Sequence, residues 1–153
     1  MEQVEIDVRD LPAQKGRTLG PGPWHRIDQD RVNLFAEATG DHQWIHVDVE
    51  QAASGPFGGT IAHGYLTLSM LPMLQGELWK FVGSSMGVNY GMDKVRFPAP
   101  VPVGSNVRLT VEVQDVEERP DGSYLLRNQA TIERDGGDRP VCVAQTLAIL
   151  RPA

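Results

Sequence analysis

A carboxylate and an imidazole stand five positions apart in the segment ATGDHQWIH, which covers residues 38–46. Asp41 and His46 can share the protons of one water molecule, since both groups can exchange protons near neutral pH when burial tunes them. Such a pair would hold and activate the water. Spacing alone favours a plainer interpretation, in which Asp41 caps a turn and His46 is structural, because five extended residues span up to about 17 Å. A turn must therefore bring the two groups together.

The other histidines raise the question of a metal site, which needs three or four ligands that converge on one ion. Asp41, His42 and His46 carry suitable ligand atoms, but neighbouring loop positions rarely converge, and the sequence has no second ligand cluster. We therefore expect no metal. His25 carries no signal of its own, and a satisfied structural histidine is the default interpretation of His63.

The elements that position the pair follow from local signals. A short strand is expected at 24–27, and Asp28 is a suitable helix N-cap. Apolar residues recur at helical spacing over 29–39, which predicts a helix there. Gly40 stands where a glycine commonly ends a helix, so Asp41 would be the first residue beyond the helix end.

A buried helix is expected further along the chain. After a short helix at 49–53, capped by Asp48, the residues from 63 to 79 are apolar on nearly all sides. Pro72 should kink this helix. Gly64 would open it with an unpaired N–H, which can stabilise negative charge that develops on a carbonyl oxygen. Close packing of another group is the plainer interpretation of Gly64 taken alone.

The remaining sequence alternates apolar and polar residues, which indicates strands. Short connections, including a turn at Asp121-Gly122, favour an antiparallel order. We expect long strands near residues 88–97, 107–113, 126–132 and 141–149. A buried helix followed by such strands predicts an α+β arrangement in which the sheet wraps around the helix.

The length of 153 residues favours one domain spanning 1–153, with residues 1–22 as an N-terminal arm of little structure. A net charge of −6 argues against a nucleic-acid binder, whose affinity depends on many cationic side chains. No apolar run reaches the ~18 residues of a membrane span. Cys142 is the single cysteine, and the acidic N-terminus is not a targeting segment, so a cytoplasmic setting is expected.

Three segments in order carry a resemblance to a known family: TGDHQWIHVD, then GPFGGTIAHGYLTLSMLP, then NYGMDKVRFPAPVPVG. They resemble the MaoC-like R-specific enoyl-CoA hydratases, and more narrowly the short, single-domain actinobacterial members. The likeness runs from about Trp24 to the last strand. Its signature is Gly-Asp, a His five residues after the Asp, and a His-Gly that opens a long apolar helix. A chance match to all three is improbable.

The resemblance implies a hot-dog fold, in which an antiparallel sheet wraps a long central helix, and a homodimer in which two sheets join. It implies that Asp41 and His46 form the catalytic dyad and that the Gly64 N–H faces the thioester oxygen. No cofactor is implied, because CoA or phosphopantetheine is part of the substrate, and an acyl carrier protein is a possible partner. Further residues expected at the substrate are His63, Trp44, Asn89, Lys94 and Arg96.

One departure and three alternatives accompany this interpretation. The family's usual Asn-Pro between Asp and His is replaced by Gln43-Trp44, which bears on acyl-chain preference.

The first alternative is a (3R)-hydroxyacyl-carrier-protein dehydratase, the same reaction on another carrier. The second is a hot-dog thioesterase, which often has an acid on the central helix, whereas Glu77 lies near its far end. The third is a non-catalytic acyl-thioester-binding subunit, against which the intact Asp41 and His46 pair speaks.

Overall fold

The structure is a computed structural model that describes residues 2–153. The strands are β1 (Val4–Asp7), β2 (Thr18–Leu19), β3 (His25–Arg26), β4 (Trp79–Val82), β5 (Ser84–Arg96), β6 (Asn106–Glu118), β7 (Tyr124–Arg134) and β8 (Cys142–Pro152). The helices are the 3-10 helix η1 (Val8–Gln14), α1 (Gln29–Thr39), α2 (Trp44–Val47), α3 (Val49–Ala53), α4 (Gly64–Ser69) and α5 (Leu71–Leu78).

The long strands form an antiparallel sheet in the order β2-β6-β7-β8-β5, and β3 also pairs with β6. Alternating residues of β6 are buried, from Val107 to Val113, and those between them are more exposed. This period of two places one face of the sheet on the core. Register shifts between β5 and β8 mark bulges, which bend the strands and help the sheet to curve.

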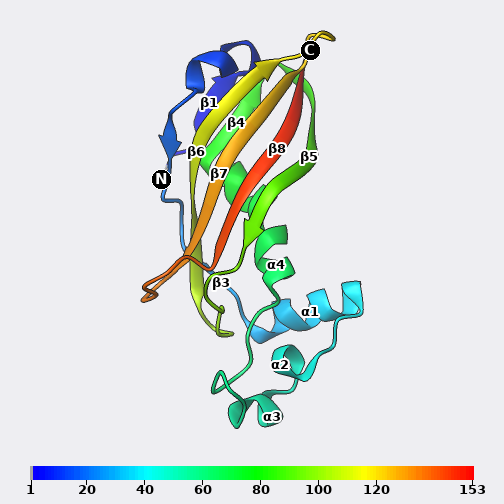
Figure 1. Cartoon of the computed structure of the whole chain (residues 1–153), viewed down its shortest axis with the longest axis vertical. Helices are drawn as coiled ribbons and strands as arrows, with labels where there is room; N and C mark the ends of the chain where they lie inside the picture. Colours follow the sequence, from blue (N-terminus) through cyan, green and yellow to red (C-terminus); the bar gives the residue numbers. More distant parts are fainter. Residues whose placement is uncertain (1) are drawn as a thin grey trace.

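Helices α4 and α5 pack against the inner face of this sheet. Figure 1 shows the green helix passing behind the long strands, with α4 emerging beside the end of β5 and pointing toward α1. The arrangement confirms the predicted α+β hot-dog architecture. Burial of an apolar side chain contributes roughly 1.5–3 kcal/mol, so the contact between helices and sheet dominates the core. The core residues from the helices are Leu66, Met70, Leu71, Leu74 and Leu78, and those from the strands include Leu109, Val111, Leu126, Ala130, Ile132 and Ala144.

The prediction of one kinked helix over 63–79 was wrong in its detail. The helix is divided at Met70, where the amide bonds back to carbonyls of α4 and a new helix begins. Pro72 lies in the first turn of α5. The N–H groups of a first turn have no partner within the helix, so the missing N–H of proline costs little there. Trp79 is extended and begins β4. Among residues 2–153, no helix combines the length and apolar character needed to cross a membrane.

The N-terminal segment differs from the arm of little structure that was expected for residues 1–22. β1 pairs in parallel with β4, seventy-five positions along the chain, with Val4 opposite Trp79. Ile6, Val8 and Leu11 are buried in the core. The sequence did not indicate this, because the strand has four residues and gains its order from a partner far along the chain.

Helices α1, α2 and α3 gather at one end of the molecule, beyond the ends of the long strands (Figure 1). Their predicted caps are confirmed. The Asp28 carboxylate accepts from the Arg31 amide at 2.9 Å, and the Asp48 carboxylate accepts from the Gln51 amide at 3.0 Å. Gly40 ends α1 in the left-handed region, with φ of 79°. This small helical cluster carries the candidate site residues.

Candidate active site

The turn after α1 brings Asp41 close to His46 and also to His63. One carboxylate oxygen of Asp41 and one ring nitrogen from each histidine all lie within 4.8 Å of one another. Asp41 follows the end of α1, His46 lies on α2, and His63 precedes α4. Three separate elements therefore bring their side chains together at one point. The spacing of these residues along the chain does not by itself predict this.

Asp41 is positioned by the end of its helix. The Gly40 amide donates to the Ala36 carbonyl at 2.8 Å, and the left-handed backbone at Gly40 turns the chain away from the helix axis. The Asp41 carboxylate accepts from the Gln43 amide at 3.3 Å and is otherwise exposed. The carboxylate therefore has an oxygen free to accept a hydrogen bond from a water.

The surroundings of His46 determine which of its nitrogens carries a proton. Nδ1 lies 2.7 Å from the carbonyl oxygen of Ile61. A carbonyl only accepts, so Nδ1 must be the N–H, and in the neutral ring Nε2 holds the lone pair. The backbone around His46 is also fixed, because Gln29 donates to its carbonyl at 2.8 Å and accepts from Thr60 at 2.7 Å. His46 is thus a buried, oriented base.

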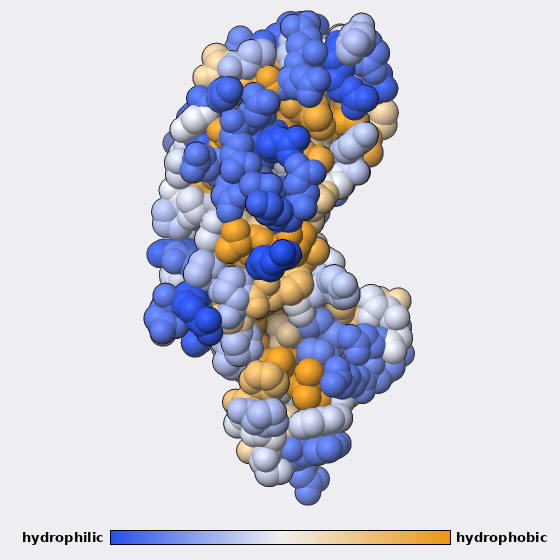
Figure 2. Space-filling view, in the orientation of Figure 1, coloured by the Kyte–Doolittle hydropathy of each residue, from blue (hydrophilic) through white to orange (hydrophobic). Residues whose placement is uncertain are grey.

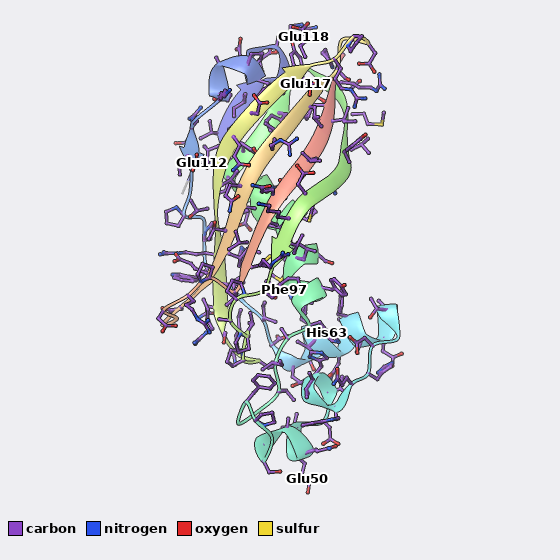
Figure 3. The ribbon with its side chains drawn as sticks, viewed as in Figure 1. Glu50, His63, Phe97, Glu112, Glu117 and Glu118 are labelled. Carbon is purple, nitrogen blue, oxygen red and sulfur yellow. The ribbon has the colours of Figure 1, made fainter. Side chains whose placement is uncertain are left out.

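His63 lies against both members of the pair. Its ring stacks on that of His46 with centroids 3.9 Å apart, and its Nε2 lies 3.0 Å from the backbone carbonyl of Asp41, to which it donates. Phe35 packs on the same ring at 4.9 Å. His63 is 2% exposed, and its Nδ1 has no hydrogen-bonding partner within residues 2–153. Figure 3 shows it where the helical cluster meets the start of α4.

Gly64 opens α4, and no backbone carbonyl in the described part of the chain accepts its N–H. A side chain here would collide with another group, since an added Cβ would lie 3.0 Å from the ring of Phe97. Phe97 follows β5 and also meets Tyr65 edge to face, and Figure 3 shows it above His63. Gly64 therefore fits both interpretations: the ring of Phe97 packs closely against it, and its own N–H is available to a ligand.

A cavity of about 470 Å³ opens between the central helices and the inner faces of β5, β7 and β8. Leu68 and Ser69 of α4 line it, and Asn89 of β5 lines the opposite wall. Asp41, His46 and Gly64 do not line it. Ser69 is five residues beyond Gly64, about 7.5 Å along a helix. The cavity is open to the surface, since its lining residues Ser69, Asn89 and Tyr90 are exposed. Its size is in the range of small-molecule pockets.

The other residues expected at the substrate lie apart from this cavity. The ring of Trp44 packs against Gly55, where an added Cβ would lie 3.0 Å from it. Lys94 and Arg96 are exposed on β5, and the Arg96 guanidinium donates to the Val95 carbonyl at 2.7 Å. Among the five expected residues, the structure brings His63 to the dyad and Asn89 to the cavity.

Asp41, His46 and His63 also carry the donor types of a metal site. Metal ligands direct their lone pairs at a single point about 2 Å from each donor. The two imidazole planes here are stacked and only 26° apart, so their in-plane lone pairs run side by side and do not converge. One nitrogen of each ring already donates to a carbonyl. The rings are therefore oriented by hydrogen bonds to the backbone and not toward a shared ion.

Two groups of acids lie away from this site. Glu77 of α5 is engaged with His25, whose Nε2 lies 2.8 Å from its carboxylate. Figure 3 shows Glu112, Glu117 and Glu118 on the sheet half of the molecule, far from His63, and all three are exposed. The carboxylate that meets the histidines is therefore Asp41.

Sequence reasoning did not single out several residues that build this site. Gln29, Phe35 and Phe97 hold His46, His63 and Gly64 through contacts that span between 17 and 33 positions of the chain. Ile61 acts through its backbone carbonyl, which carries no side-chain signal. One signal was available for Phe35: it lies near the end of the predicted helix, close in sequence to Asp41, which could have suggested that it contacts the site.

Comparisons with known proteins identify the family and the fold of this chain. A model of the MaoC-like domain family matches residues 10–133. The 3-hydroxyacyl-thioester dehydratase Z of Mycobacterium tuberculosis is 51% identical over 140 residues, covering 92% of this chain and 93% of that protein. A monoamine oxidase regulatory protein of Archaeoglobus superposes with a TM-score of 0.80 at 25% identity, over 100% of this chain and 99% of its own. The (R)-hydratase of A. caviae shares the fold, with a TM-score of 0.72 at 24% identity over 88% of this chain and 94% of that one.

Proposed function

Because the chain belongs to the MaoC-like dehydratase family, we propose that it hydrates trans-2-enoyl-CoA reversibly to (3R)-hydroxyacyl-CoA, with Asp41 and His46 activating the water. The observation that carries this proposal is the orientation of His46. Its Nδ1–H is held by the Ile61 carbonyl, and one of its ring nitrogens lies within 4.8 Å of the Asp41 carboxylate. A water that bridges Nε2 and the carboxylate would have a base on each side.

In the proposed reaction the water attacks C3 of the enoyl thioester, which is electrophilic because the conjugated carbonyl withdraws electrons. The dyad takes one proton from the water as the new C–O bond forms. Electrons move to the thioester oxygen, and the Gly64 N–H donates to this developing enolate. The dyad then returns the proton to C2 as the carbonyl re-forms. The net addition is one hydroxyl at C3 and one hydrogen at C2.

We assign His63 a positioning role in this scheme. It donates to the Asp41 carbonyl and stacks on His46, so a single ring fixes both members of the dyad. Its burial leaves little surface for contact with a ligand. Positioning of this kind matters because a displacement of about 1 Å can cost ~10²-fold in rate.

We further propose that two chains associate through β5. This strand is at the edge of the sheet, where backbone groups are free to pair with another strand. Its exposed apolar residues are Met86, Val88, Tyr90 and Met92. Figure 2 shows apolar surface along this margin of the sheet half, among hydrophilic residues. A homodimer joined edge to edge would cover these side chains.

We propose CoA as the carrier of the acyl group. Lys94 and Arg96 are exposed cations on the strand that leads to Phe97, so they are suited to the phosphates of CoA. No metal or redox cofactor takes part in the scheme. A net charge of −6 offers no general attraction to an acidic carrier protein or to the phosphates of CoA, so the preference for CoA rests on these two cations.

The test is incubation of the protein with crotonyl-CoA in the presence of a chelator. The proposal predicts loss of the conjugated enoyl-thioester absorbance and formation of the (3R) product, identified by chiral chromatography. Crotonyl carried on acyl carrier protein should react more slowly. Faster reaction of the carrier-protein substrate would indicate the alternative dehydratase, and release of free thiol would indicate a thioesterase. Tight binding of acyl-CoA without turnover would indicate a non-catalytic subunit.

A further inference from the structure

Helix α2 carries His46 on a single short turn, Trp44–Val47. No side chain caps the beginning of this helix, and an isolated helix of this length is not stable in water. Contacts with other segments must therefore hold α2 in place. One of these segments meets it at Ile61, whose carbonyl accepts from Nδ1 of His46 and whose amide donates to the Ile45 carbonyl at 3.0 Å.

The ring of Trp44 holds another side of α2. Residues 44 and 46 are about 200° apart around a helix, so their side chains point in nearly opposite directions. The Trp44 ring packs on Gly55, in the loop of residues 54–60, and Figure 1 shows this loop returning from α3 toward α4. A Cβ built on Gly55 would lie 3.0 Å from Cζ3 and 3.2 Å from Cη2 of the ring. The contact is therefore as close as a residue without a side chain permits.

We propose that Trp44 is a positioning residue, which clamps α2 against Gly55 and so fixes the angle at which His46 meets Asp41. This inference rests on the proposed function, in which these two side chains share one water. A rotation of α2 about its axis would move the His46 ring away from the Ile61 carbonyl and change its distance to the Asp41 carboxylate. The packing of Trp44 opposes that rotation, and a displacement of about 1 Å can cost ~10²-fold in rate.

The loop itself offers a matched pair of variants. Gly55→Ala adds a methyl group that presses on the Trp44 ring and also lies 3.2 Å from the Ala52 carbonyl oxygen. Gly59→Ala adds the same methyl group in the same loop, where nothing lies within 4 Å of it. Neither glycine has a positive φ, so alanine is compatible with the backbone at both positions. The two variants therefore differ in their contact with Trp44.

Trp44→Phe tests the same contact from the other partner, because phenylalanine lacks the ring atoms that reach Gly55. On its own this substitution should loosen the clamp. Combined with Gly55→Ala it should restore activity toward that of wild type, since the shorter ring leaves room for the methyl group. Such non-additivity is expected of two residues in direct contact and not of two that act separately.

The first measurement is kcat and KM with crotonyl-CoA for wild type, the three single variants and the double variant. Gly55→Ala and Trp44→Phe should each lose about tenfold in kcat with little change in KM, because His46 shifts by a fraction of an ångström while the substrate contacts remain. The double variant should lose less than either. Gly59→Ala should match wild type, and thermal unfolding shows whether each variant is folded.

The second measurement needs no substrate. The nitrogen NMR shifts of the His46 ring, recorded on protein with labelled histidine, distinguish a proton on Nδ1 from a proton on Nε2. Wild type and Gly59→Ala should carry the proton on Nδ1, as the bond to the Ile61 carbonyl requires. Gly55→Ala and Trp44→Phe should give a mixture of the two tautomers, because the loosened ring leaves that carbonyl for part of the time.

A lower thermal stability of Gly55→Ala with unchanged kcat and an unchanged His46 tautomer would overturn the inference, because the contact would then only support the loop. Equal losses in Gly59→Ala, or additive losses in the double variant, would overturn it as well. If Gly55→Ala does not fold, Trp44→Phe answers the same question. Failure of wild type to hydrate crotonyl-CoA would count against the proposed function itself, and the tautomers would still decide whether Trp44 orients His46.

Discussion

The imidazole ring of His63 stacks on that of His46, with centroids 3.9 Å apart and planes inclined by 26°. The stacking holds the ring of His46 in place from one side. His63 also donates from Nε2 to the Asp41 carbonyl. His63 is therefore the supporting ring, and His46 is the base, whose Nδ1–H donates to the Ile61 carbonyl.

His63→Leu should lower kcat by about 10²-fold with little change in KM, because the dyad loses its support while the substrate contacts remain. His63→Gln should recover much of this loss, since its side-chain amide can still donate to the Asp41 carbonyl. Steady-state kinetics of both variants with crotonyl-CoA, together with their thermal unfolding, make the comparison. A rise in KM at unchanged kcat would contradict positioning and would place His63 at the substrate. Equal losses in both variants would also count against the hydrogen bond.

Gly40→Ala tests the turn that presents Asp41. An added Cβ would meet nothing within 4 Å, but φ is 79°, a conformation that costs an alanine about 1–2 kcal/mol. Gly136→Ala is a matched control, because Gly136 has φ of 75°, also has open space around it, and lies between β7 and β8. Chemical denaturation should show similar stability losses in both variants. Only Gly40→Ala should lose activity as well, and equal activities would contradict the role of this turn.

Cys142 should resist thiol reagents in the folded protein. It is fully buried at the start of β8, and burial raises the pKa of its thiol from 9.0 to about 11. The reactive thiolate is therefore scarce at pH 8, since the neutral thiol is favoured up to about pH 11. Titration with a chromogenic disulfide should give almost no reaction until denaturant is added. Rapid stoichiometric reaction of the native protein would contradict this burial.

Local signals predicted much of the helical cluster from the sequence. The bounds of α1 and α3, the caps at Asp28 and Asp48, and the glycine at position 40 all depend on residues within one or two turns. The alternation of β6, β7 and β8 was equally clear, because one face of each strand is buried along its length. These features needed no knowledge of the tertiary structure.

Features that depend on distant contacts were not predicted. β1 gains its order from β4, and the division of the central helix depends on where Met70 and Pro72 fall relative to the core. In the site, the motif indicated Asp41, His46 and Gly64, whereas the Ile61 carbonyl carries no side-chain signal at all.

The most direct measurement is the rate at which crotonyl-CoA loses its conjugated absorbance with wild type and with Asp41→Asn. The substitution keeps the size of the side chain and an oxygen that can still accept from the Gln43 amide, so the fold should be retained. Wild type should react readily, and the variant should lose at least about a hundredfold in kcat, the contribution typical of a general acid or base. A loss smaller than about tenfold in a folded variant would contradict the central role of Asp41.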